Sequence, residues 1–157
     1  MAKGNKIKTF LWFDNQAEEA AKFYTSVFKD GKIGAIARFP EGSPRPTGMV
    51  MTVAFRVAGH DFVALNGGPE FKLNESVSFA IECETQKEID YYWDKLLAGG
   101  GSPSQCGWLK DRYGVSWQVV PAEMGKLFSK PQKAERVMKA MLGMVKLDVK
   151  KLEAAAK

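Results

Sequence analysis

Two stretches of the sequence, 7-IKTFLWFDNQAEEAAKFYTSVF-28 and 77-VSFAIECETQKEIDYYWDKLLA-98, follow the same plan, and they decide the fold. Each begins with an apolar run of strand-forming residues and continues into an apolar stripe with helical spacing. The copies align with an offset of 70 residues, which places Asp14 on Glu84 and Glu18 on Glu88. We interpret the chain as an internal repeat whose copies each open with a strand and a helix.

Each predicted helix begins with a capping box, formed by Asn15 and Glu18 in the first copy and by Thr85 and Glu88 in the second. In such a box the short side chain accepts from an amide of the first turn, and the glutamate reaches back to the amide of the cap. Glycines follow both stripes, at Gly31 and at 99–101, and mark the helix ends.

Further strands are predicted after each helix. The first copy offers 32–39, 48–57 and 60–66, with a loop over 40–48 and a hairpin turn at 58–59. The second offers 104–111 and 115–120. Each copy is therefore a strand, a helix and then two or three strands, which we interpret as a βαβββ module, and the predicted class is α+β. The modules, about 5–68 and 75–122, are expected to pack side by side in one domain over residues 1–128.

The remaining residues, 129–157, form a predicted helical tail packed on the domain or on a partner subunit. Pro131 suits a first helical turn. Asp148 is a plausible N-cap with Leu147 and Leu152 at the positions that flank it. An apolar stripe is expected at Val137, Met138, Met141 and Leu142. We expect the methionines to be packing residues, and the alternative is an adaptable methionine-rich binding surface.

Charge is concentrated in this tail. The chain of 157 residues has a net charge of +5, and the tail holds eight basic and three acidic residues, so it carries the whole excess. A basic tail could meet nucleic acid or a membrane surface. Because it lacks interleaved aromatic residues, we favour a solvated helical face and expect neither partner.

Composition is that of a soluble globular protein, with 45% hydrophobic and 26% charged residues. No apolar run approaches the ~20 residues of a membrane span, and the first ten residues lack the apolar core of a secretory signal. Two cysteines, Cys83 and Cys106, make no disulfide framework. We therefore expect a reduced, cytoplasmic protein.

The chain resembles the PhnB-like branch of the vicinal oxygen chelate superfamily, the branch labelled "3-demethylubiquinone-9 3-methyltransferase". The resemblance is carried by 11-LWFDNQAEEAAKFY-24, 65-LNGGPEFKLNESVSF-79, 82-ECETQKEIDYYWDKL-96, 105-QCGWLKDRYGVSWQVVP-121 and 137-VMKAMLGMVKLDVKKLEAA-155. It implies paired modules whose sheets curl into a ligand-holding cup, as in glyoxalase I, extradiol dioxygenases and bleomycin-resistance proteins. In the metal-dependent members, the first and last strands of each module supply His or Glu ligands.

At the positions that this resemblance assigns to metal ligands, the chain has Ile7, Leu65 or Asn66, Val77 and Gln118. Divalent catalytic metals require imidazole or carboxylate ligands, so we expect no metal site. The single histidine, His60, lies at a hairpin turn beside Asp61. The amide of Gln118 could instead orient a neutral polar ligand, and the alternative is a buried amide satisfied by its own sheet.

Four further residues are candidates for ligand contact. Trp108 is a candidate stacking wall, and Asn66 and Phe71 could form the rim of the pocket, although their loop could simply be a turn. Cys106 precedes this tryptophan closely, but a catalytic thiolate needs a nearby base, and a structural cysteine is favoured.

The function expected from these observations is metal-free binding of a small organic molecule, without a cofactor, by a homodimer paired through sheet edges and C-terminal helices. The alternative is an enzyme, either a methyltransferase, as the family label states, or a metal-dependent lyase or dioxygenase. The glycines at 66–68 and 99–101 do not fit a loop for S-adenosylmethionine, because the first run leads into Pro69 and the second follows a helix.

Overall fold

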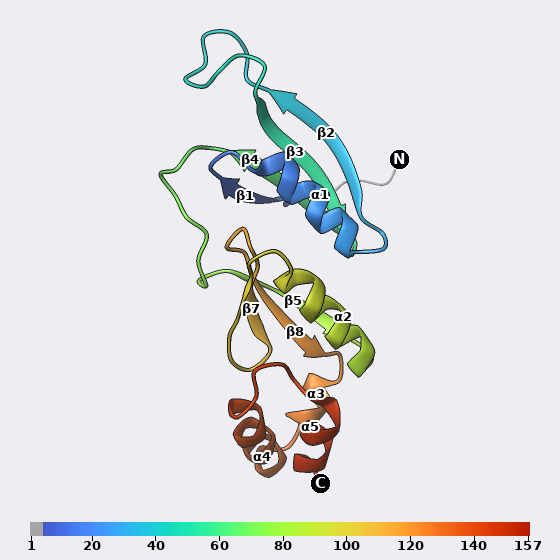
Figure 1. Ribbon diagram of the computed structural model, residues 1–157. Coiled ribbons are helices and arrows are strands. Elements are labelled where there is room, and N and C mark those ends of the chain that lie inside the picture. Colours follow the sequence, from blue (N-terminus) through green and yellow to red (C-terminus); the bar gives the residue numbers. More distant parts are fainter. Residues whose placement is uncertain (1–4) are drawn as a thin grey trace. The chain divides into compact units, whose positions relative to one another are not determined.

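A computed structural model describes residues 5–157 of the chain. These residues form two compact units, which divide between Leu73 and Asn74. Each unit contains one four-stranded mixed sheet with a helix on one face (Figure 1). None of the helices described is long and apolar enough to cross a membrane.

The first unit contains β1 (Thr9–Phe13), α1 (Ala17–Val27), β2 (Lys32–Arg38), β3 (Val50–Val57) and β4 (His60–Asn66). The strand order is β1-β4-β3-β2, with β1 parallel to β4 and the other pairs antiparallel. Ala58 and Gly59 join β3 to β4 with φ angles of 48° and 73°. Positive φ at two central residues is the geometry of the tightest hairpin turn, as predicted for this dipeptide.

The second unit repeats this plan with β5 (Ser78–Cys83), α2 (Gln86–Leu97), β6 (Ser102–Pro103), β7 (Trp108–Lys110) and β8 (Ser116–Pro121). The order β5-β8-β7-β6 again pairs the first strand of the module in parallel with the last. The predicted α+β class with two βαβββ modules is therefore confirmed. The strand expected over 104–111 is shorter, because the backbone at Cys106 and Gly107 turns through positive φ angles of 58° and 81°.

One face of each sheet is buried by its helix. In the first unit, Tyr24 of α1 stacks on Phe55 of β3 with a centroid separation of 5.7 Å, and Phe55 stacks on Phe62 at 5.1 Å. In the second, Trp93 of α2 and Trp117 and Val119 of β8 are buried. We call the face of each sheet that is opposite its helix the open face. Because side chains alternate along a strand, every second residue belongs to it.

The two capping boxes have different outcomes. Thr85 accepts from the amide of Glu88 at 3.2 Å, as predicted, while the Glu88 carboxylate accepts from the Glu84 amide at 2.7 Å, one residue before the cap. The prediction of a capping box at Asn15 and Glu18 is wrong. Helix α1 starts at Ala17, and its N-cap residue, Gln16, makes no side-chain capping bond. A residue distant in the sequence provides that bond, as described below.

The second unit also contains the short helix α3 (Met124–Leu127) and the tail, which forms α4 (Pro131–Leu142) and α5 (Val149–Ala155). The core formed by α3 and the tail is a buried cluster of Leu127, Val137, Leu147 and Leu152. Asp148 caps α5 by accepting from the Lys151 amide at 3.1 Å, which confirms the predicted cap. The apolar stripe of α4 is only half buried, because Met138 and Leu142 are 40% and 59% exposed.

Candidate functional site

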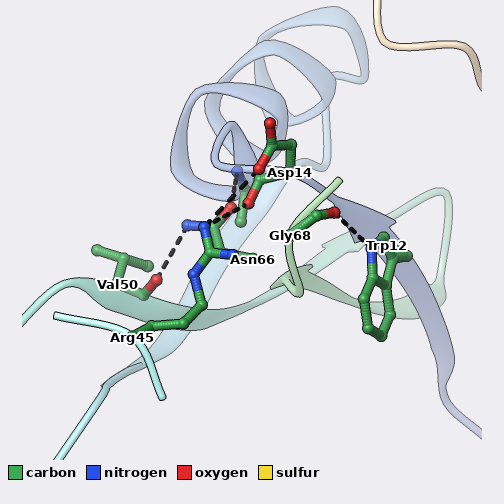
Figure 2. Close-up of polar contacts among 7 residues, drawn as sticks. Trp12, Asp14, Arg45, Val50, Asn66 and Gly68 are labelled. Atoms are coloured by element: carbon green, nitrogen blue, oxygen red, sulfur yellow. Dashed lines mark hydrogen bonds and ion pairs between the residues drawn. The ribbon is translucent and has the colours of Figure 1, made fainter. Parts of the chain in front are cut away.

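At the carboxyl ends of β1 and β4, the first unit has a polar cluster centred on Asn66 (Figure 2). Asn66 is 2% exposed. Its Oδ1 accepts from the Ala17 amide at 2.8 Å, and its Nδ2 donates to the Val50 carbonyl at 2.9 Å. One side chain thus caps α1 and ties it to the start of β3. Since this amide is turned toward the helix side of the sheet, Asn66 holds the fold together at this point.

The loop after Asn66 wraps around Trp12, which lies on the open face. The Trp12 indole donates to the Gly68 carbonyl at 2.9 Å (Figure 2). Phe71 meets the Trp12 ring edge-on with a centroid separation of 4.9 Å. A Cβ on Gly67 would lie 2.3 Å from that ring, so only glycine fits there. Phe71 remains 66% exposed. The predicted rim residue therefore lies against a tryptophan, with most of its own ring open.

Sequence patterns did not identify the partner of Asp14. Arg45, from the loop before β3, donates to the Asp14 carbonyl at 3.2 Å, and the same nitrogen lies 3.7 Å from the Asp14 carboxylate (Figure 2). The loop is thereby fixed to the end of β1. No local spacing could indicate this contact, because 31 residues separate the two positions.

In the second unit, the register brings two predicted site residues together. Trp108 on β7 pairs directly with Gln118 on β8, so both side chains lie on the open face. Ala80 of β5 lies opposite Gln118 on its other side, and this small residue leaves the amide flanked by a single bulky neighbour. Gln118 and Trp108 are both half-buried.

Polar groups on this face are incompletely paired. Gln118 Nε2 donates to Ser78 Oγ at 2.9 Å, which orients the amide. Among residues 5–157, nothing hydrogen-bonds to the side-chain carbonyl oxygen of Gln118 or to the indole N–H of Trp108. Ser116 shares the face and is 2% exposed, yet within the described chain its hydroxyl has no partner. A buried hydroxyl without a partner is destabilising by about 1–3 kcal/mol. The half-buried side chains of Gln118 and Trp108 are the groups of this set that a ligand could reach.

Cys106 and Gly107 anchor the tail. Their amides donate to the carbonyls of Met144 and Val145 at 2.9 and 2.8 Å, and the Cys106 thiol lies 3.5 Å from the Met141 carbonyl. A Cβ on Gly107 would lie 2.8 Å from the Val119 carbonyl. The motif 105-QCGW-108 thus has two parts with different roles, a tail anchor at Cys106 and Gly107 and an open-face residue at Trp108.

Two other residues of the second unit, Trp117 and Cys83, are buried on the helix side of the sheet. Trp117 is 3% exposed and donates to Asp111 at 2.8 Å, and the Asp111 carboxylate also accepts from the amides of Tyr113 and Val115. Cys83 is 2% exposed, as expected of a core residue. Burial, with a smaller contribution from the charge of Glu88, raises the pKa of the Cys83 thiol to about 12.

The positions that the family assigns to metal ligands do not form a metal-ligand set. Ile7 and Val77 are 83% and 63% exposed and precede their strands, and the Asn66 oxygen is bonded to the Ala17 amide. Only Gln118 offers a polar group on an open face. Within the described residues, no group of three His, Cys, Asp or Glu side chains could hold a metal ion. The residues present therefore do not fit the metal centre of the metal-dependent relatives.

Comparison with known proteins agrees with this architecture. The family model described as 3-demethylubiquinone-9 3-methyltransferase matches residues 5–120. A solved structure described as a putative 3-demethylubiquinone-9 3-methyltransferase, PhnB protein, from Bacillus cereus shares 36% identity with a TM-score of 0.66, covering 74% of this chain and 99% of that one. No curated protein matches the chain.

Two more distant structures share the fold. A protein from Pseudomonas aeruginosa has 22% identity and a TM-score of 0.60, covering 75% of this chain and 98% of that one. The fosfomycin resistance protein FosX from Mesorhizobium loti has 10% identity and a TM-score of 0.59, covering 82% and 99%. By its sequence match and its paired βαβββ modules, the chain belongs to the 3-demethylubiquinone-9 3-methyltransferase family, within the vicinal oxygen chelate superfamily.

Proposed function

We propose that the protein binds a small organic molecule on the open face of its second sheet, without a metal ion or a cofactor. The observation that carries this proposal is the direct pairing of Trp108 with Gln118, whose amide is oriented by its hydrogen bond to Ser78. An aromatic wall with a few convergent polar groups is the usual composition of a small-molecule site.

The chemistry of these groups favours an uncharged polar ligand. The side-chain carbonyl oxygen of Gln118 can accept a hydrogen bond from a ligand, and the Trp108 indole N–H can donate one. The one cation on the same face of β7, Lys110, forms an ion pair with Glu75. A ligand such as a small amide, lactam or hydroxy compound would satisfy these groups while its flat part stacks on the tryptophan.

The alternative of an enzyme has less support from the residues. Methyl transfer from S-adenosylmethionine commonly uses a glycine-rich loop between a strand and the following helix. Within the described residues, a strand leads directly into a helix at 14-DNQ-16, 84-ET-85 and 122-AE-123, and none of these three connections contains glycine. The strand-to-helix connections therefore do not fit S-adenosylmethionine, and the residues at the family's metal positions do not fit a divalent ion. We therefore propose binding, with sequestration as the simplest biological use.

Assembly as a homodimer in the cytoplasm is part of the proposal, with neither nucleic acid nor membrane as a partner. All seven residues of the edge strand β2 are exposed, including Ile33 and Ile36, as are Met138 and Leu142 on α4. Exposed apolar groups on an edge strand and a helix favour pairing with a second copy. Light scattering should give twice the mass of the chain, and a particle of a single chain's mass would contradict this part.

The test of ligand binding is a thermal-shift screen of small uncharged polar compounds. A compound present at about 100 times its Kd stabilises the folded protein by roughly 2.7 kcal/mol, which is readily measured. We expect stabilising compounds to lose their effect with Gln118→Leu and Trp108→Ala, while Gln132→Leu, a change in the tail, leaves it intact. Retention of the effect in both site variants would refute the location. A stoichiometric metal ion in the purified protein would refute the metal-free chemistry.

A further inference from the structure

A second hollow, in the first unit, has a different chemistry. It has a volume of about 250 Å³ and is lined by all four strands of the first sheet or by residues adjacent to them. None of the residues of the Trp108–Gln118 site contributes to it. The charge and the size of the residues that line this hollow indicate which class of ligand it would bind.

One row of charged residues crosses the sheet at this hollow. The register pairs Lys32 of β2 with Arg56 of β3, and Arg56 with Asp61 of β4. Lys8 completes the row, because the next residue, Thr9, pairs with the residue after Asp61. Three cations thus stand against one anion along this row, and all four residues line the hollow.

The cations of the row are only partly neutralised. Among the described residues, Arg56 is the one ion-pair partner of Asp61, at 3.6 Å, and Arg56 also donates to the Gly59 carbonyl at 3.1 Å. The nearby Asp30 carboxylate is occupied by the amides of Ala58 and Gly59 at 2.9 and 3.1 Å. Within residues 5–157, the side-chain ammonium groups of Lys8 and Lys32 have no hydrogen-bond or ion-pair partner. Two ammonium groups therefore face the hollow without a counter-charge.

The neighbouring row explains why there is a hollow at all. There the sheet has Gly34 and Ala54 next to each other, and a Cβ placed on Gly34 would lie 3.5 Å from the Ala54 Cβ. These small residues form a low, apolar floor beside the row of charges. A flat carbon group fits such a floor, while an acidic group at its end reaches the lysines.

From this combination we propose that the hollow is a second binding site, one for a small organic anion with a carboxylate or phosphate group and a flat carbon body. The acidic group pairs with Lys8 and Lys32, and the carbon body lies over Gly34 and Ala54. Since the site uses no residue of the second unit, it is independent of the function proposed above.

The test is a titration followed by amide NMR signals, with benzoate as the probe. We expect benzoate to shift the signals of Gly34 and Ala54, and to bind more tightly than benzamide, which lacks the charge, and than acetate, which lacks the ring. An ion pair in water at 4 Å is worth ~1 kcal/mol, so Lys8→Gln and Lys32→Gln should each weaken benzoate binding about fivefold. Lys87→Gln, an exposed lysine on α2, is the matched control and should leave the affinity unchanged.

A charge change of the opposite kind sharpens the test. Asp61→Asn removes the anion that competes for Arg56, so benzoate should bind several-fold more tightly, whereas Asp94→Asn makes the same change in net charge on α2 and should have no effect. The proposal is overturned if benzoate shifts no signal near Gly34, if benzamide binds equally well, or if the control variants act like the site variants. Gln118→Leu should not alter benzoate binding, which separates this proposal from the first.

Discussion

Replacing Asn66 by alanine is expected to destabilise the protein by about 2–4 kcal/mol. The side chain is 2% exposed and makes two hydrogen bonds to the backbone, one to the first amide of α1 and one to the Val50 carbonyl. Loss of a helix-capping side chain costs roughly 1 kcal/mol. Loss of the second bond, which leaves the Val50 carbonyl without this donor, adds about 1–3 kcal/mol.

Asn15→Ala is the matched control, because the sequence pattern assigns the cap to that residue. Asn15 is exposed and makes no hydrogen bond with any residue among those described. A surface substitution of this kind changes stability by no more than about 0.5 kcal/mol. The two variants have the same chemistry, so their difference isolates the tertiary contact.

Urea unfolding followed by circular dichroism measures the two free energies, and hydrogen exchange at the Ala17 amide reports on the cap directly. We expect faster exchange at Ala17 in the Asn66 variant only. Equal stability losses in both variants, or a loss below ~0.5 kcal/mol for Asn66→Ala, would refute the structural role of Asn66. In that case Asn66 would again be a candidate for ligand contact.

Three further predictions concern the remaining polar and thiol groups. A thiol reagent at pH 8 should modify Cys106 and spare Cys83 in the native protein, because burial raises the pKa of Cys83 to about 12; rapid modification of both would contradict this burial. Gly107→Ala should destabilise the protein by about 2 kcal/mol or more, because φ is +81° and the new Cβ would lie 2.8 Å from the Val119 carbonyl. Loss of this tail anchor should also make residues 131–155 more sensitive to protease. Unchanged protease sensitivity would refute the role of Gly107 as an anchor. Hydrogen bonds from the Ala58 and Gly59 amides lower the pKa of Asp30, so its stabilising effect is present above the ordinary carboxyl pKa and is lost as the pH falls through the lowered value. Asp30→Asn should therefore flatten the stability curve in that acidic range, and an unaltered curve would count against the contact.

Much of the fold follows from local signals. The βαβββ order, the 58–59 hairpin and the caps at Thr85 and Asp148 were predictable, because each depends on residues adjacent in the sequence or on alternation within one strand. Alternation within β8 likewise puts Gln118 and Trp117 on opposite faces of the sheet. These signals are short-range. The capping box predicted at Asn15 is equally local, and it failed because the distant Asn66 bonds to the first amide of α1 instead.

The site required the tertiary structure. The pairing of Trp108 with Gln118 depends on the register of β7 and β8, and the Asn66 cap joins residues 49 positions apart. Likewise, Cys106 and Gly107 meet the tail only once the chain has turned back on itself. Sequence patterns carry the preferences of single segments, whereas these contacts arise when segments distant in the chain are packed together. The sequence by itself therefore determined the elements and their order, and the packing of distant segments decided which polar groups are used by the fold and which remain available to a ligand.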